Sequence, residues 1–316
     1  MFIPKTGKRP NDMAKSYRPI TLSSFMLKSM EKVIDRHIRS KYIPISPLHP
    51  RQFAYQEGKS TSMAVKSLVT DIERMLNYKK SAIGISIDIE GAFDNVRYDV
   101  LKRALLQKEV HPIIIDWIYS MLKMRSLRVE LAGEIAYIKP VKGCPQGGAL
   151  SPLLWTLVVD ELLHNLNDNG LRTDGFADDL FALILGFDFS TMSDLAQQVC
   201  STVENWCNNV GLKVNPDKVS LVVFSHKKKR NGYKDPILFG KQIKPSNEVK
   251  YLGVYLDQTL NWEKHLDNIT SKAVGALFAC RRMVGSKWGI KPKMMTFRLL
   301  GQFWLMQLQY GTENVQ

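Results

Sequence analysis

Cysteine, histidine and long apolar runs are all scarce in this sequence, and each absence excludes a class of protein. The four cysteines form no C-x-x-C pair and the six histidines form no cluster beside them, which argues against a zinc site. So few cysteines also fit a reduced compartment, so we expect an intracellular protein of the nucleus or the cytoplasm. Residues Met1–Lys5 lack the apolar core of a signal peptide, and no apolar run reaches the length of a membrane span. We therefore expect no membrane partner.

Positive charge is in excess. Lysine and arginine number 44 against 30 aspartates and glutamates, a formal net charge of +14. A surplus of this size indicates a polyanionic partner, nucleic acid before membrane. The alternative is a basic protein whose charge only keeps it soluble. The run Lys227–Arg230 is interpreted as a solvated hairpin loop, with a nuclear signal as the alternative.

Apolar periodicity predicts helices and strands in irregular alternation. Helices are expected at 24–42, 61–78, 98–123 with a break at Pro112, 151–167 capped by Ser151, 193–209 closed by Gly211, and from 261 onward. Strands are expected at 82–89, twice within 127–141, as a hairpin at 175–185, at 214–224 and within 236–256. The residues expected on buried faces are Met26, Met30, Ile34 and Ile38 in the first helix, and Leu266 and Ile269 in the last. This order predicts an α+β fold with an antiparallel central sheet.

Two adjacent carboxylates interrupt the hairpin at 175–185. Asp178 and Asp179 have apolar flanks on both sides, so burial and mutual repulsion should raise at least one pKa unless a divalent cation is bound. The alternative is a polar β-turn, for which aspartate is well suited. Asp88 lies near the end of another apolar strand, followed by Asp94. If the two strands are neighbours, their carboxylates meet at one sheet edge, where two Mg²⁺ ions could support phosphoryl transfer.

A glycine-rich loop, 143–150, precedes the predicted helix at Ser151. Its glycines would let the backbone approach a ligand closely. No lysine follows the glycines as a nucleotide-binding P-loop requires, so the loop is not of that class. Taken alone, a plain turn is the simpler interpretation.

These segments together resemble the reverse transcriptase domain of non-LTR (LINE-type) retrotransposons along almost the whole chain. Seven motifs occur in the family's order: Phe2–Lys5 with Ser16–Leu22 and Glu31–Lys32, Gln52–Thr61, Ile87–Asp94, Pro145–Pro152, Phe176–Asp179, Gly211–Lys218 and Tyr251–Val254. Each motif is weak or moderate alone, but seven in the right order are a specific signal. The resemblance implies a right-hand polymerase fold with fingers, an antiparallel-sheet palm and a helical thumb.

The resemblance also implies roles for individual residues. Asp88, Asp178 and Asp179 would hold two Mg²⁺ ions, with Mn²⁺ as the alternative, and the Ile89 carbonyl would be a further ligand. Lys218 would protonate the leaving pyrophosphate, and Arg18 would touch the triphosphate or the template. Phe93 would exclude a ribose 2′-OH, while Gln146 and Gly147 would line the new base pair. The simpler interpretations are a core aromatic for Phe93 and a solvated lysine for Lys218.

The expected division is fingers over 1–80, incomplete at their N-terminal side, palm over 81–258, and thumb over 259–316, with its truncation left open. The expected activity is RNA-directed DNA polymerase, with an RNA template, a DNA primer, an RNA–DNA hybrid and deoxynucleoside triphosphates as partners. Lys264, Lys272, Arg281 and Arg282 would contact the duplex backbone. The rival functions are a catalytically dead retrotransposon relic, an RNA-binding module of the same fold, and a group II intron maturase.

Overall fold

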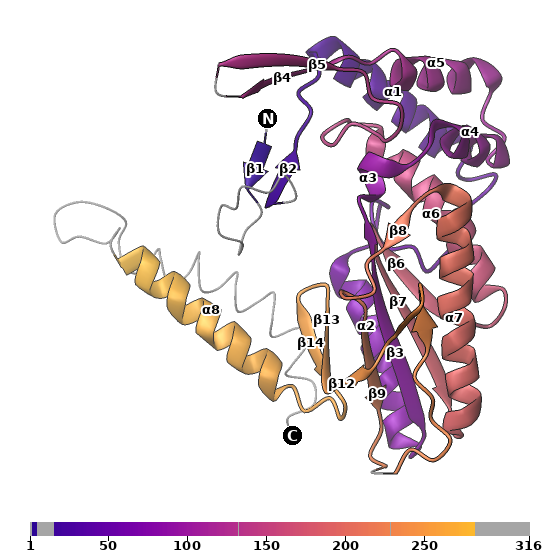
Figure 1. Ribbon diagram of the computed structural model, residues 1–316, viewed down its shortest axis with the longest axis vertical. Helices are drawn as coiled ribbons and strands as arrows, with labels where there is room; N and C mark the ends of the chain where they lie inside the picture. Colours follow the sequence, from indigo (N-terminus) through magenta and orange to yellow (C-terminus); the bar gives the residue numbers. More distant parts are fainter. Residues whose placement is uncertain (1, 5–15, 132, 228, 282–316) are drawn as a thin grey trace.

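The computed structural model describes residues 2–4, 16–131, 133–227 and 229–281 (Figure 1). The helices are α1 (Phe25–Lys41), α2 (Thr61–Asn77), α3 (Ala92–Asn95), α4 (Tyr98–Gln107), α5 (Pro112–Lys123), α6 (Ser151–Asn167), α7 (Phe189–Val210) and α8 (Glu263–Arg281). The longer strands are β3 (Ser81–Glu90), β4 (Leu127–Leu131), β5 (Glu134–Ile138), β6 (Thr173–Phe176), β7 (Asp179–Gly186), β9 (Ser220–Phe224), β13 (Glu248–Tyr251) and β14 (Val254–Asp257). The short ones are β1 (Phe2–Pro4), β2 (Tyr17–Pro19), β8 (Lys213–Val214), β10 (Ile237–Leu238), β11 (Lys241–Gln242) and β12 (Pro245–Ser246).

A central sheet carries the fold, in the order β12-β9-β3-β7-β6, with β8 paired to the end of β3. All its pairs are antiparallel except β12 with β9, so the predicted antiparallel sheet is confirmed. Apolar strand residues alternate between the two faces, as a period of two requires. Ile83, Ile85 and Ile87 pack into the core that contains α6 and α7. The opposite face, with Phe181 and Phe224, packs against α2 and the β13–β14 hairpin.

Gly84 shows how closely the second face is packed. A Cβ at this position would lie 2.8 Å from the ring of Phe181 and 2.9 Å from the ring of Phe224. The strand therefore has no side chain where the two rings meet, and this gap lets them cover the backbone of β3. The sheet centre accordingly combines β-branched residues on one face with aromatic residues on the other.

Most predicted helices form, and their ends have identifiable caps. Ser24 and Ser60 accept hydrogen bonds from backbone N–H groups in the first turns of α1 and α2. Gly211 ends α7 in the left-handed conformation, as predicted. However, α7 begins at Phe189 rather than 193, because Asp188 supplies the cap. Among the described residues no helix is both long and apolar enough to cross a membrane.

The predicted buried face of α1 is wrong in its first half. Met26 is 74% exposed and Met30 46% exposed, whereas Glu31 and Ile38 are buried. Each four-residue step along a helix advances about 40° around its axis, so three steps turn the stripe by about 120°. The stripe that begins at Met26 thus lies on a different side from Ile38.

Three further expectations need correction. Ser151 is the first helical residue rather than the cap, and its hydroxyl donates to the Pro145 carbonyl at 2.8 Å. The strand predicted at 214–224 is two strands, because Asn215 starts a turn in which its side chain accepts the Asp217 N–H. In α8 Leu266 is 53% exposed while His265 is buried, so the predicted apolar stripe does not face the protein at that point.

Candidate active site

Three predicted carboxylates meet at one end of the central sheet. The register of β3 with β7 places Asp88 directly opposite Asp179. Asp178 precedes Asp179 in the turn from β6, and its carbonyl accepts the Ile89 N–H at 3.1 Å. The structure therefore brings Asp88, Asp178, Asp179 and Ile89 together, as the sequence predicts for a metal site.

The turn between β6 and β7 is stabilised by a side chain of α6. Ala177 has a φ of +55°, in the left-handed region. Its carbonyl accepts a hydrogen bond from the indole N–H of Trp155 in α6, at 2.7 Å. A backbone conformation that costs energy in a non-glycine residue is thus fixed by a buried side chain. This contact positions the two carboxylates that follow.

The negative charges of the three carboxylates are only partly balanced by nearby cations. Burial raises the pKa of Asp179 to about 6, with repulsion from Asp178 and Asp88 adding to the effect. The pKa of Asp178 is also raised, first by loss of hydration and then by the Asp88 carboxylate, although Arg18 and Lys218 oppose the rise. Both shifts mean that the site favours additional positive charge. The donors are all oxygens, which suit Mg²⁺ or Mn²⁺, so the residues present fit the predicted metal pair.

Lys218 forms ion pairs with two carboxylates at the end of β3. Its ammonium lies 3.2 Å from an Asp88 oxygen and 3.3 Å from a Glu90 oxygen. Partial burial lowers the pKa of Lys218, but the hydrogen bonds and attraction from Asp88 and Glu90 outweigh it and raise the pKa overall. Lys218 is therefore an exposed lysine that is ion-paired at the edge of the site.

Phe93 lies in an aromatic group with Tyr55 and Trp155. Its ring contacts Tyr55 edge to face at 6.5 Å and Trp155 at 6.1 Å between centroids. Tyr55 is close enough to Asp178 that burial and then this carboxylate raise the tyrosine pKa. The sequence predicted Phe93 as a site residue but gave no role to Tyr55. An aromatic residue in a finger motif was the only available signal for it.

The glycine-rich loop is hydrogen-bonded to α3, which follows β3 and carries Phe93. The Cys144 N–H donates to the Phe93 carbonyl at 2.6 Å, and the Gln146 amide donates to Asp94 at 2.7 Å. Gly143 has a φ of +81°, and a Cβ there would overlap the Asp94 carbonyl. The loop therefore approaches the site as closely as its glycines allow, and this places Gln146 beside the segment of Phe93.

The segment from Thr21 to Glu31 contacts the same loop from the other side. The Thr21 N–H donates to the Gln146 carbonyl at 2.8 Å, and a Cβ on Gly147 would lie 3.2 Å from the Thr21 carbonyl. Glu31 in α1 is buried, and its carboxylate accepts the Ala149 N–H at 2.7 Å. The sequence named Glu31 only as part of a motif. Its role as a support for the loop depends on a contact between residues 118 positions apart.

The remaining predicted contacts divide into two kinds. Arg18 is exposed in β2, and its positive charge opposes the rise in the pKa of Asp178. Lys264, expected at the duplex backbone, is exposed and pairs with Glu248 at 3.2 Å. A separate group, His49, His164 and Asp168, has its potential metal-ligand atoms within 4.8 Å of one another. It contains two imidazoles and none of the three aspartates of the predicted magnesium site.

Comparisons with known proteins agree with this geometry. Residues 3–256 match the family described as reverse transcriptase (RNA-dependent DNA polymerase). The chain is 27% identical to a Pol polyprotein of the type-1 retrotransposable element R1 from Bradysia coprophila, over 94% of this chain and 29% of that protein. It is 26% identical to the RNA-directed DNA polymerase from the mobile element jockey of Drosophila melanogaster, over 85% of this chain and 30% of that protein. The chain thus spans about a third or less of these relatives.

A solved structure shows the same fold. Telomerase from Candida tropicalis, in complex with a TWJ fragment of telomeric RNA, superposes with a TM-score of 0.56 at 13% identity, over 88% of this chain and 48% of that one. At this identity the likeness concerns the fold alone. With the family match over four-fifths of its length and relatives among non-LTR retrotransposon polymerases, the chain belongs to the reverse transcriptase (RNA-dependent DNA polymerase) family.

Proposed function

We propose that the chain is the polymerase domain of a non-LTR retrotransposon protein and adds deoxynucleotides to a primer 3′-OH on an RNA template. The convergence of Asp88, Asp178 and Asp179 at one sheet end carries the proposal. A dead relic of the fold would be expected to have lost one of these carboxylates, and all three are present. The excess of positive charge supports nucleic acid as the partner.

Reverse transcriptases generally use divalent metal ions, and the oxygen donors at this sheet end suit two Mg²⁺ ions. Asp88, Asp178, Asp179 and the Ile89 carbonyl would hold them. The ions would lower the pKa of the primer hydroxyl and neutralise charge on the departing pyrophosphate.

Other residues of the chain would position the substrates. Phe93 would fill the space beside C2′ of the incoming sugar, because Tyr55 and Trp155 hold its ring from two sides. Gln146 and Gly147 would contact the new base pair, and Arg18 the triphosphate. Lys218, kept charged by Asp88 and Glu90, would deliver a proton to the pyrophosphate oxygen.

The proposed division assigns 1–80 to the fingers, 81–258 to the palm and 259–316 to the thumb. Lys264 and Lys272, both exposed on α8, would contact the hybrid backbone, and Lys264 also pairs with Glu248. Arg281 and Arg282, also expected at the duplex, have side chains outside the described residues. The nucleus or cytoplasm is the proposed location, since the activity requires access to RNA and deoxynucleotides.

Primer extension on poly(rA)/oligo(dT) with dTTP and Mg²⁺ tests the proposal. Asp178→Asn keeps the side-chain shape and removes a charge, so extension should fall by about three powers of ten, the equivalent of roughly 4 kcal/mol of transition-state stabilisation. Asp188→Asn is the matched control, because asparagine caps α7 as well as aspartate does. Template–primer binding should persist in both variants. Near-normal extension by Asp178→Asn would refute the assignment of the site.

A further inference from the structure

Two histidines that are far apart in the sequence meet at the C-terminal end of α6. His49 lies in the segment between α1 and α2, and His164 lies in the last turn of α6. Their rings contact edge to face, with 4.9 Å between the centroids. Asp168, the C-cap of α6, adds a carboxylate, and one potential ligand atom from each of the three residues lies within 4.8 Å of the others. The proposed polymerase function makes no use of this group.

The spacing of His164 and Asp168 suits a bridging metal ion better than a direct contact. His164 Nδ1 lies 3.6 Å from an Asp168 oxygen, which is too far for a hydrogen bond of about 2.9 Å. Zinc binds imidazole nitrogen and carboxylate oxygen at about 2.0–2.2 Å, so two ligands of a tetrahedral ion are about 3.4 Å apart. Residues four positions apart lie on one side of a helix, as zinc-binding pairs on helices do. An ion would therefore fit between these two groups with little movement of either.

His49 supplies a third ligand whose position is fixed. The residue is 8% exposed, its backbone N–H donates to Asp160 at 2.7 Å, and its Nδ1 accepts the Arg51 N–H at 3.2 Å. An ion would compete only with this long hydrogen bond for the ring. Burial lowers the pKa of His49, with repulsion from His164 adding to the effect, although Asp160 and Asp168 oppose the fall. The imidazole is therefore neutral at pH 7, which is the form that binds metals.

The simpler interpretation is a protonated His164 held between two carboxylates, because its Nε2 also lies 3.8 Å from an Asp160 oxygen. However, Asp160 already pairs with Lys108 at 2.8 Å and accepts the His49 N–H. The charge of this buried carboxylate is thus compensated without His164. Two imidazoles and one free carboxylate are the donors that suit Zn²⁺, whereas Mg²⁺ prefers oxygen ligands.

We propose that this group binds a Zn²⁺ ion through one nitrogen of each imidazole and one Asp168 oxygen, with water in the fourth position. The ion would tie the segment 49–53 to α6. The same segment is joined to β6, because the Phe53 N–H donates to the Gly175 carbonyl at 2.8 Å. The role of the ion would be structural: it would stabilise the packing of this segment against α6 and β6, and would take no part in phosphoryl transfer.

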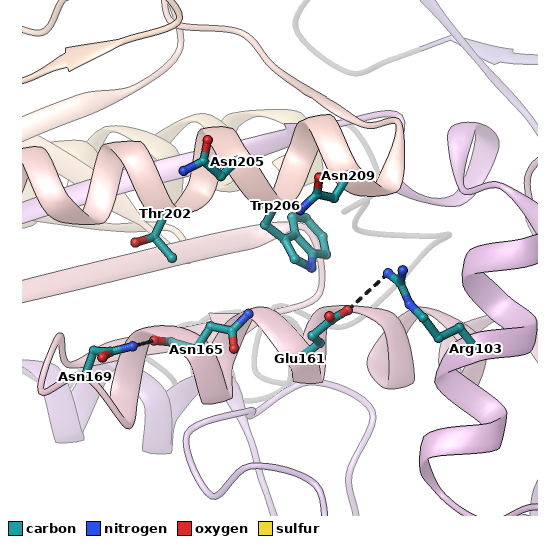
Figure 2. Close-up of a pocket in the computed structure, with 8 residues that line it drawn as sticks. All are labelled: Arg103, Glu161, Asn165, Asn169, Thr202, Asn205, Trp206 and Asn209. Carbon is teal, nitrogen blue, oxygen red and sulfur yellow. Dashed lines mark hydrogen bonds and ion pairs between the residues drawn. The ribbon is translucent and has the colours of Figure 1, made fainter.

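Asn165 offers a matched control on the same helix. It directly follows His164 and is exposed, but its side chain lines a polar groove between α6 and α7, as Figure 2 shows. None of the three proposed ligands is among the described residues that line this groove. Asn165→Ala therefore alters the surface of α6 beside the site and leaves the ligands in place.

Isothermal titration calorimetry of the untagged chain with ZnCl₂, in excess Mg²⁺, tests the proposal. His164 and Asp168 have side chains that are 44% and 70% exposed, so their alanine variants should fold. Each variant should bind zinc at least about tenfold more weakly, since loss of even an outer-shell partner costs about 10–100-fold. Asn165→Ala should bind zinc as tightly as the original chain. Asp178→Asn should do so too, which separates this site from the carboxylate site.

Urea denaturation gives a second readout. An ion that binds the folded chain shifts the equilibrium toward it, so zinc should raise the urea midpoint of the original chain and of Asn165→Ala, but not that of His164→Ala. Neither measurement uses primer extension, so the result stands or fails independently of the polymerase assignment. Absence of zinc binding to the original chain, or equal affinity in His164→Ala, would overturn the proposal. Loss of zinc in Asp178→Asn would assign the ion to the carboxylate site and overturn it too.

Discussion

Glu31 provides a test of how α1 supports the glycine-rich loop. Its buried carboxylate accepts the Ala149 N–H through one oxygen, while the other oxygen has no partner among the described residues. Glu31→Ala would leave the amide of Ala149 unsatisfied, a loss of about 1–3 kcal/mol, and would open a small void as well. Glu31→Gln retains an acceptor and removes a buried charge, so its free energy of unfolding should stay within about 1 kcal/mol of the original.

Urea denaturation measures the two variants, with Lys32→Ala as control because Lys32 is exposed on the same helix. Steady-state extension over a range of dTTP concentrations measures the consequence for the site. Since Ala149 lies in the same loop as Gln146, Glu31→Ala should raise KM for dTTP, and Glu31→Gln should restore it. Equal unfolding free energies for Glu31→Ala and Lys32→Ala would refute the idea that this carboxylate holds the loop.

Three further substitutions test other parts of the structure. Phe93→Val should raise the ratio of kcat/KM for ribonucleotide over deoxynucleotide, and an unmoved ratio would make Phe93 a packing residue only. Gly84→Ala should lower the free energy of unfolding by about 1–3 kcal/mol, because the rings of Phe181 and Phe224 occupy the space of the new methyl group. Lys272→Ala should reduce the slope of log affinity for RNA–DNA hybrid against log salt by about one unit. The same slope as in the original chain would place Lys272 outside the interface.

The sequence was informative where a residue type conflicts with its surroundings. Charged pairs inside apolar runs are rare, so Asp178 and Asp179 could be singled out without a structure, and the apolar strand before Asp88 predicted β3 correctly. Local signals also predicted the end of α7 at Gly211. Such predictions depend on neighbours in the chain, which periodicity and turn chemistry describe well.

Long-range contacts were not predictable in the same way. Nothing near Glu31 indicates that its partner is Ala149, and nothing near Trp155 indicates that its indole supports the Ala177 carbonyl. The prediction of the buried face of α1 failed for a related reason. Met26 and Ile38 are both apolar, and only the position of the neighbouring elements decides which of them is covered. Tertiary packing therefore selects among faces that the sequence alone leaves equivalent.

The register of one strand pair links the stability of the sheet to the position of the carboxylates. Residues 81–88 pair one to one with 186–179, which puts Asp88 and Asp179 on the same face as Phe181. A slip of one residue would set Asp88 opposite Leu180, whose side chain belongs to the core under α6 and α7. That arrangement would turn a carboxylate toward an apolar core, at a large cost in solvation. The apolar pairs that stabilise β3 against β7 therefore also exclude the one-residue slips that would separate the charges.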